Sequence, residues 1–354
     1  MLLTVSLKLE TSSEEKSKLL KTMFVFNSAC DYISSYAFSN QIFNNVNLHH
    51  AIYYDVRKRF KLSSQFTVRA ISKVCDTYKT DKKVQHRFRK TSSVPYDEKL
   101  LSFNKLDSLS LLTTSGRLKK VPFSYGEYAN LPEKVISKSA LLIRRNKEFY
   151  LQVLVEVPEA PLQKADEFLG VDLGIVNLAT TSLGNIYTGQ KVDEVRERMT
   201  SLRGRLQAVG TKSAKRHLVR ISKKERNFKR NTNHIISNLI VLTAQRHHLS
   251  IAIEELSGFR KTVNKKQRDR FGKWAFAELQ AFIVYKAALL GIKVVFINPR
   301  DTSRTCNICF FCDKRNRKDQ DFKCLQCGYV NHADINAAIN IAARASVNRL
   351  IVAA

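Results

Sequence analysis

The hydrophobic pattern of the N-terminal half changes twice along the chain. Residues 1–10 alternate apolar and polar side chains, as in a β-strand with one buried face. Residues 14–80 then favour helices, and the first N-cap is expected within Thr11–Ser13. From 84 to 158 short β-like runs follow: SLSLLTT, RLKKVPF, SALLIRR and FYLQVLVEV. We expect strand 1–10 to join that sheet, so that the helices form an insert.

The C-terminal half reads as an α/β succession that begins after a proline-containing boundary at 158–167, PEAPLQKADE. Apolar runs predict buried strands, and longer amphipathic stretches predict helices. In order, we expect a strand FLGVDLGIVNLATTS (168–182) with GNIYTG as its hairpin partner, a long basic helical region (190–247), a strand LSIAIEEL (249–256), a helix (272–290), a strand GIKVVFINP (291–299) and a helix (334–347).

Composition narrows the class of protein. The 354 residues suffice for two or three domains. No apolar run is long enough to span a bilayer, and the start of the chain turns polar too soon for a signal peptide. The formal charge of +29 calls for a polyanionic partner: nucleic acid is the first candidate and an anionic membrane is the rival.

Three acidic residues lie where apolar residues are expected. Asp172 interrupts the strand GVDLGIV, Glu254 ends the run IAIEEL, and Asp334 begins a helix rich in Ala and Ile. A buried carboxylate without a partner is costly. Strand alternation sends Glu254 and Glu255 to opposite faces, so only one of them can join Asp172.

Each acid also has an ordinary structural interpretation. Asp334 could be a plain helix N-cap, Asp172 could end a strand, and Glu254 could pair with an arginine. Together, however, the three suit a carboxylate cluster for two hard cations, Mg²⁺ or Mn²⁺. Such a pair of ions clamps both the attacking water and the leaving oxygen of a phosphodiester. With the basic charge, this cluster predicts a nuclease.

The cysteines predict a second metal site. Five of the seven fall between 306 and 327, which favours a reduced cytoplasm and a metal over a disulfide framework. Cys306-x2-Cys309 and Cys324-x2-Cys327, with 14 residues between the pairs, match four-thiolate zinc spacing. Cys312 repeats the same step and stays an alternative to Cys309. Four thiolates leave no open position, so we expect a structural ribbon that fixes the helix carrying Asp334.

The motifs GVDLGIVNLATTS, IAIEEL, WAFAELQAFIVYKAALLGIKVVFINP and TSRTCNIC…CLQCGYVNHADINAAINIA resemble the nuclease half of TnpB proteins. These are OrfB-type, insertion-sequence-encoded RNA-guided nucleases, similar to compact type V CRISPR effectors. The resemblance covers residues 168–347. In the N-terminal half it is one of architecture only.

The resemblance implies a multidomain α+β fold. A β-barrel-like wedge domain (1–10 and 84–158) would carry an inserted helical recognition lobe (11–83). An RNase H-like, RuvC-type α/β nuclease domain (167–300 and 331–354) would carry a zinc-ribbon insertion (301–330).

The resemblance also implies residue roles. Asp172, Glu254 and Asp334 would be the catalytic, Mg²⁺-binding acids, and Cys306, Cys309, Cys324 and Cys327 the zinc ligands. Arg317 would lie near the scissile phosphate. After the second cysteine of the first pair the family usually has glycine, where this chain has Phe310. The turn formed by Cys306–Phe310, the first knuckle of the ribbon, is therefore expected to differ.

A basic segment at 201–230 holds eleven Lys and Arg against one acid, Glu225. Charge runs are usually solvated helix faces, but so lopsided a ratio favours contact with phosphates. In an RNA-guided nuclease, an A-form RNA–DNA heteroduplex would lie there. The nucleic-acid-binding candidates are Arg203, Arg205, Lys212, Lys215, Arg216, Arg220, Lys223 and Lys224.

The resulting hypothesis is a Mg²⁺-dependent, RNA-guided DNA endonuclease encoded by a transposable element. Its expected partners are a guide RNA, double-stranded target DNA and their heteroduplex, and no membrane. We expect a monomer, with a dimer as the alternative, in a prokaryotic cytoplasm and at the nucleoid when bound to DNA. The rival hypotheses are a nuclease-deficient RNA-guided repressor and an accessory transposition protein.

Overall fold

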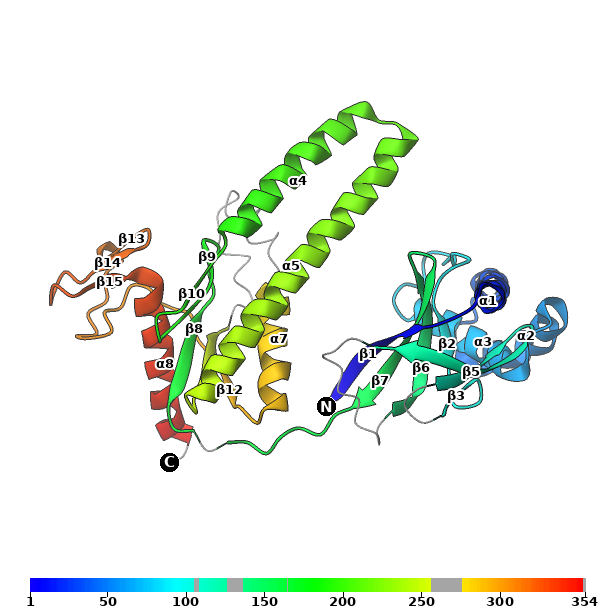
Figure 1. Ribbon diagram of the computed structural model, residues 1–354, viewed down its shortest axis with the longest axis horizontal. Helices are drawn as coiled ribbons and strands as arrows, with labels where there is room; N and C mark the ends of the chain where they lie inside the picture. Colours follow the sequence, from blue (N-terminus) through cyan, green and yellow to red (C-terminus); the bar gives the residue numbers. More distant parts are fainter. Residues whose placement is uncertain (105–107, 126–135, 164, 256–275, 353–354) are drawn as a thin grey trace. The chain divides into compact units, whose positions relative to one another are not determined.

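A computed structural model describes residues 1–104, 108–125, 136–163, 165–255 and 276–352. The chain divides into two compact units, Met1–Pro158 and Glu159–Ala354 (Figure 1). Within the described residues, no helix has the length and apolar character needed to cross a membrane.

The first unit combines an antiparallel sheet with three helices. The sheet has the order β2-β6-β7-β1-β5-β4-β3, and β1 pairs with both β7 and β5, so the prediction that the first strand joins the sheet is confirmed. Ser12 caps α1 and forms a reciprocal capping box with Glu15, as expected for the first N-cap. The elements are β1 (Leu2–Leu9), α1 (Ser13–Ser39), α2 (Asn45–Phe60), α3 (Ser64–Tyr78), β2 (Val94–Tyr96), β3 (Leu101–Asn104), β4 (Ser108–Thr113), β5 (Gly116–Ser124), β6 (Ile136–Arg145) and β7 (Glu148–Glu156).

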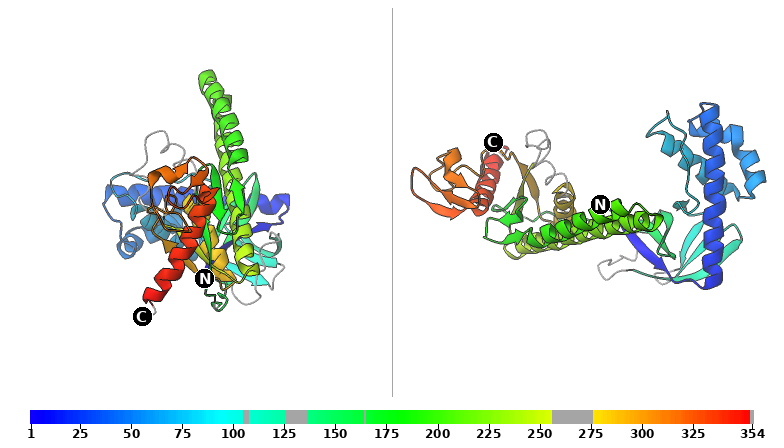
Figure 2. Two further views of the ribbon diagram at one scale, coloured as in Figure 1. Left: turned by 90° about the vertical axis from the view of Figure 1, so that its left-hand side faces the viewer. Right: turned by 90° about the horizontal axis from the view of Figure 1, so that it is seen from above.

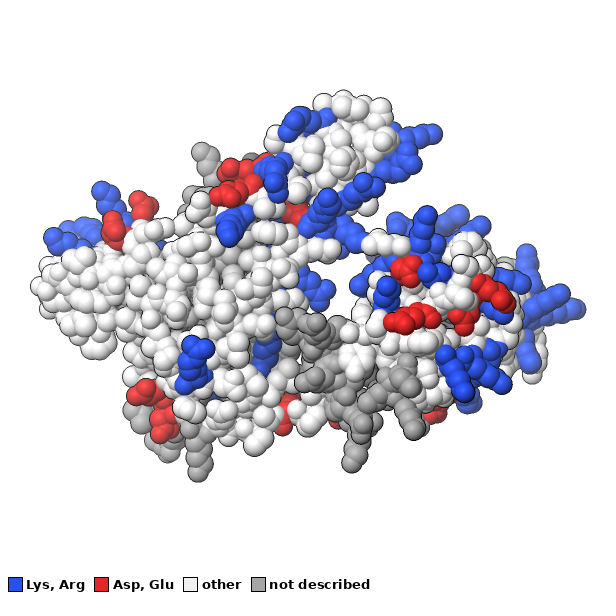
Figure 3. All heavy atoms as spheres, viewed as in Figure 1, with Lys and Arg blue, Asp and Glu red and all other residues white. Residues whose placement is uncertain are grey.

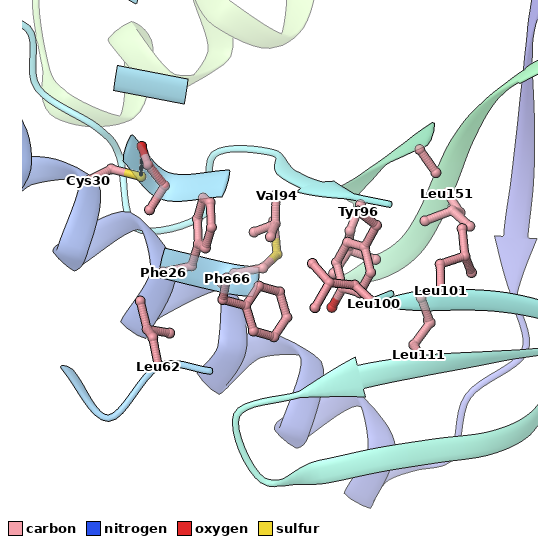
Figure 4. Close-up of a cluster of buried hydrophobic side chains, with 14 of the residues drawn as sticks. Phe26, Cys30, Leu62, Phe66, Val94, Tyr96, Leu100, Leu101, Leu111 and Leu151 are labelled. Carbon is pink, nitrogen blue, oxygen red and sulfur yellow. Dashed lines mark hydrogen bonds between the residues drawn. The ribbon is translucent and has the colours of Figure 1, made fainter. Parts of the chain in front are cut away.

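One hydrophobic core holds these helices and strands together (Figure 4). Phe66 of α3 lies between Phe26 of α1 and Tyr96 of β2, with ring centroids 6.0 and 5.6 Å away. The Tyr96 hydroxyl donates a 2.8 Å hydrogen bond to the Leu112 carbonyl of β4. Because β2 is an edge strand and β4 lies one strand from the other edge, the sheet curls into a nearly closed barrel.

The second unit contains a five-stranded mixed sheet of order β10-β9-β8-β11-β12. Strands β8, β11 and β12 are parallel, whereas β9 and β10 are antiparallel. Its elements are β8 (Phe168–Asp172), β9 (Asn177–Thr181), β10 (Ile186–Thr188), α4 (Gln190–Val209), α5 (Lys212–Arg246), β11 (Ser250–Glu254), α7 (Phe276–Leu289), β12 (Val294–Ile297), η2 (Lys314–Asn316), β13 (Arg317–Lys318), β14 (Asp321–Lys323), β15 (Val330–His332) and α8 (Ala333–Val352).

The prediction of a single strand over 168–182 is wrong. The chain turns after Asp172 and returns as β9, which places Asp172 opposite Thr180. At Gly174 a β-carbon would lie 2.7 Å from the Asn177 carbonyl, so this tight turn favours glycine. Both strands are almost wholly buried, so the apolar run continues through the turn. The sequence pattern therefore does not mark where one strand ends and the next begins.

The basic region 190–247 is a helical hairpin. Helix α4 ends at Gly210, whose φ of +66° glycine adopts without strain, and the Thr211 side chain caps α5. The two helices run side by side in every view (Figure 1, Figure 2).

The two faces of the sheet are covered by different helices (Figure 1). Phe168 and Ala252 pack with Ile341 of α8, whereas Val171 and Ile253 belong to the core made with α5 and α7. Alternate positions of β8 and β11 therefore face α8. Gly170 is one of them: a β-carbon there would lie 1.9 Å from the Ala338 carbonyl, so helix and strand touch through their backbones.

Candidate metal centres

Two of the three predicted acids lie at the carboxyl ends of neighbouring parallel strands. Ile253 of β11 pairs with Val171 of β8, so Glu254 and Asp172 follow side by side at one edge of the sheet. Both occupy positions that alternate with the α5/α7 core and therefore face α8. Glu255 points to the opposite face and is exposed. The sheet thus directs Glu254, and not Glu255, toward Asp172.

Helix α8 supplies the third acid from its first turn. One carboxylate oxygen of Asp334, Oδ2, accepts a 2.8 Å hydrogen bond from Asn177 Nδ2 of β9, and Oδ1 accepts one of 2.8 Å from Arg317 Nη2 of β13. The side chain therefore bonds to other elements and caps no helix amide. The alternative that Asp334 is a plain N-cap is wrong, because both of its oxygens bind other elements and its own backbone N donates to His332 Nδ1 before the helix.

Glu254 is held by a second partner. The Thr302 hydroxyl, itself 2% exposed, donates a 2.5 Å hydrogen bond to Glu254 Oε1. Sequence reasoning singled out neither Asn177 nor Thr302. Asn177 could have been noticed in the sequence, because it is a polar amide inside the apolar run 168–182. Thr302 has no such marker in the sequence, because only folding brings its loop next to β11.

Within the part of the chain that the structure describes, the three acids have fewer positively charged partners than negative charges. Burial raises the pKa of Asp172 well above its usual value, and the charges of Glu254 and Asp334 raise it further. Burial also raises the pKa of Glu254, although the Thr302 hydrogen bond and the charges of Arg344 and Arg317 oppose that shift. Among the described residues, Arg317 forms an ion pair with the cluster, through Asp334. An environment that disfavours the carboxylates' own charge, lined by oxygen donors, fits a divalent cation.

The cysteines form the tighter group. In the described part of the chain, one set of His, Cys, Asp or Glu ligand atoms gathers as in a metal site: the sulfurs of Cys306, Cys309, Cys324 and Cys327, all within 4.8 Å of one another. The three carboxylates do not converge in this way. Cys312 lies outside the group; its thiol is exposed and its backbone bridges to Thr305.

The two knuckles of this ribbon have the same backbone geometry. Phe310 N donates to Cys306 O at 3.0 Å, just as Gly328 N donates to Cys324 O at 3.0 Å. Both residues are left-handed, with φ of +61° for Phe310 and +74° for Gly328. The expectation that the Phe310 turn differs is therefore wrong. The turn is kept, at a cost of about 1–2 kcal/mol for a residue with a β-carbon.

Two buried asparagines join the ribbon to α8. Asn336 accepts from Asn307 N at 3.1 Å and donates to Thr305 O at 2.8 Å. Asn340, one turn later, donates to the carbonyls of Thr302 and Thr305 at 2.9 and 2.7 Å. The loop that enters the ribbon thus fixes the helix of Asp334 and also carries Thr302, the partner of Glu254.

The basic candidates lie on the α4–α5 hairpin, along which Figure 3 shows several clusters of Lys and Arg. Arg203 differs from the others, because it is half-buried and pairs with Glu225, which also binds Lys229 at 3.0 Å. The remaining seven are exposed: Arg205, Lys212, Lys215, Arg216, Arg220, Lys223 and Lys224. The one acid of the segment is thus internally neutralised, and the exposed charge of 201–230 is wholly positive.

Two family models match this chain. One described as "Probable transposase" (OrfB of IS605) matches residues 152–258, which include Asp172 and Glu254. One described as "Cas12f1-like, TNB domain" matches residues 276–341, which include the four clustered cysteines and Asp334.

Individual relatives are also Cas12f nucleases and TnpB-like proteins. The CRISPR-associated endodeoxyribonuclease Cas12f1 of Syntrophomonas palmitatica is 33% identical over 46% of this chain and 36% of its own length. Cas12f1 of Sulfoacidibacillus thermotolerans is 26% identical over 88% of this chain and 84% of its own. A TnpB-like protein of Methanocaldococcus jannaschii is 35% identical over 30% of this chain and 40% of its own. The chain thus spans little more than a third of the first relative.

Among solved structures, the mini-RNA-guided endonuclease CRISPR-Cas phi3 matches with a TM-score of 0.50 and 11% identity, over 98% of this chain and 92% of that one. This likeness shows a shared mixed α/β fold. The family models and the relatives confirm the resemblance to TnpB-type proteins and to compact CRISPR effectors.

Proposed function

We propose, taking the likeness to TnpB proteins and Cas12f nucleases as the premise, that this chain is an RNA-guided DNA endonuclease encoded by a transposable element. The observations that carry the proposal are the neighbouring positions of Asp172 and Glu254 at the ends of β8 and β11, and the charge of Asp334 on α8, which acts on both of these acids. The strand order, three antiparallel strands followed by two parallel ones, supports the proposal of an RNase H-like, RuvC-type nuclease domain.

The carboxylates are proposed to hold Mg²⁺ or Mn²⁺, whose chemistry is to activate water and to neutralise charge on a phosphodiester. The donor set fits, because hard divalent cations prefer carboxylate oxygens. In this arrangement Asn177 orients Asp334 and Thr302 orients Glu254, each through one hydrogen bond. Arg317, which donates a hydrogen bond to Asp334, is proposed to contact a phosphate of the bound strand.

Zinc is proposed to sit between Cys306, Cys309, Cys324 and Cys327, as four sulfurs within 4.8 Å favour. The ribbon would then be structural. Zinc would fix the two cysteine turns, and the hydrogen bonds of Asn336 and Asn340 would fix α8 relative to them. The exposed cations of the α4–α5 hairpin are proposed to contact the backbone of a guide RNA–target heteroduplex.

The test is Asp334→Asn, with Asp321→Asn as the matched control. Both changes remove one carboxylate charge within the same region, but Asp321 is exposed on β14, where it pairs with His332, whereas Asp334 is buried and bonded to Asn177. Protein carrying its co-purified RNA is assayed for cutting of target plasmid with Mg²⁺. We expect Asp334→Asn to slow cutting by roughly 10³-fold or more. We expect Asp321→Asn to cut at the normal rate.

The proposal fails if wild-type protein with its RNA binds target DNA without cutting it, which is the behaviour of a repressor. It also fails if Asp334→Asn cuts as fast as Asp321→Asn. Melting temperatures separate chemistry from folding: a loss of cutting with a normal melt assigns the carboxylate to the reaction.

A further inference from the structure

Phe310 is an exposed aromatic residue held in a left-handed backbone conformation. Its φ is +61° and its side chain is 69% exposed. Other described non-glycine residues with positive φ carry polar or charged side chains, such as Lys61, Asn146 and Asp301. Phe310 alone among them carries a large apolar one, and it gains no burial in return.

The turn itself does not need the phenyl ring. The equivalent knuckle closes with the same hydrogen bonds around Gly328, which adopts this conformation without strain. Glycine at 310 would therefore satisfy the fold better than phenylalanine does. Strain that the fold neither needs nor offsets is characteristic of a residue that contacts a ligand.

The surroundings of Phe310 indicate which ligand. The next turn and strand carry the exposed cations Lys314 and Lys318. Asn316, in the same turn, is buried and bonds to the Phe311 and Arg304 carbonyls at 3.2 and 3.0 Å, and it accepts from Leu325 N at 3.0 Å. The ring and the cations therefore belong to one rigid piece.

The same rigid piece reaches the carboxylates. Arg317, next to Asn316, donates to Asp334 at 2.8 Å. A DNA strand with a phosphate at Asp334 would therefore lie beside this part of the ribbon. Exposed aromatic rings flanked by cations are the usual platform for unpaired nucleotides, because any base can stack on them while the cations contact phosphates.

We propose that Phe310 stacks on an unpaired base of the DNA strand delivered to the carboxylates, with Lys314 and Lys318 contacting its phosphates. The proposal deepens the proposed function and rests on it for the identity of the strand. The ring acts by positioning and takes no part in the chemistry.

The test compares Phe310→Gly with Phe310→Trp, and uses Ile308→Ala as the control on the same knuckle, where Ile308 is also exposed. Binding of the RNA-containing protein to a labelled single-stranded DNA oligonucleotide is measured by anisotropy, beside an RNA of the same sequence. We expect Phe310→Gly to melt no lower than wild type, since strain is relieved, and to bind DNA at least about fivefold more weakly. We expect Phe310→Trp and Ile308→Ala to bind like wild type or tighter.

Three results would overturn the proposal. Phe310→Gly could bind DNA like wild type; Ile308→Ala could lose as much affinity, which would indicate a general apolar patch; or the loss could be confined to the RNA oligonucleotide, which would assign the ring to the guide. Binding is read without cutting, so a protein that fails to cleave still tests the stacking.

Discussion

The structure predicts that Gly170→Ala would push α8 away from β8, because a β-carbon at this position overlaps the helix backbone. The added β-carbon would lie 1.9 Å from Ala338 O and 2.8 Å from Ala342 N of α8, where ordinary contact begins at 3.4 Å. The helix must therefore retreat by about 1.5 Å, the difference between 3.4 and 1.9 Å. Asp172 lies two residues along the same strand, and Asp334 lies one turn before Ala338 on the same helix. The retreat consequently widens the carboxylate site itself.

We expect two measurable losses. Overpacking of this kind costs about 1–3 kcal/mol, which lowers the melting temperature of a unit of this size by roughly 2–12 °C. A displacement of about 1 Å at a reacting centre can slow chemistry by roughly 10²-fold. Single-turnover cleavage with saturating RNA and Mg²⁺ measures the second effect, and a thermal melt measures the first.

Gly204→Ala is the matched control. Gly204 lies inside α4, and a β-carbon there meets nothing within 4 Å. Alanine in a helix interior should stabilise the protein by about 1 kcal/mol and leave cutting unchanged. If Gly170→Ala melts and cuts like wild type, the helix has no need of the close backbone contact, and the placement of Asp334 by that contact is refuted.

Three further predictions concern metal, charge and pH. Chelating zinc, or Cys324→Ser, should lower the melting temperature of the second unit, and folded protein with far less than one zinc per chain by elemental analysis would contradict this. Reversing Lys215 and Lys223 should reduce the slope of log affinity for a heteroduplex against log salt by roughly 0.7–0.9 per contact, and an unchanged slope would make the hairpin a solvated face. Burial raises the pKa of Asp172 and Glu254, so the contribution of these two carboxyls to the stability of metal-free protein should be greatest below about pH 4 and be lost as pH rises through the raised values; a melting-temperature difference between wild type and Asp172→Asn that does not change with pH would argue against the buried cluster.

The sequence by itself determined the features that depend on local chemistry. Ser12 caps α1 because a hydroxyl before Glu15 satisfies free helix amides wherever the helix packs. The acids in apolar strands could be recognised because a buried charge needs a partner in any fold. The paired cysteines depend on spacing alone, and the excess of Lys and Arg on composition alone.

Tertiary structure decided what depends on contacts distant along the chain. The turn after Asp172 was hidden because both β8 and β9 are buried, and buried strands lose the alternation that marks their ends. Asn177 and Thr302 gain their partners only when β9 and the loop before the ribbon reach α8 and β11. Asp334 could be told from a helix cap only by its bonds to Asn177 and Arg317, since a carboxylate at a helix start serves either purpose until its neighbours are placed.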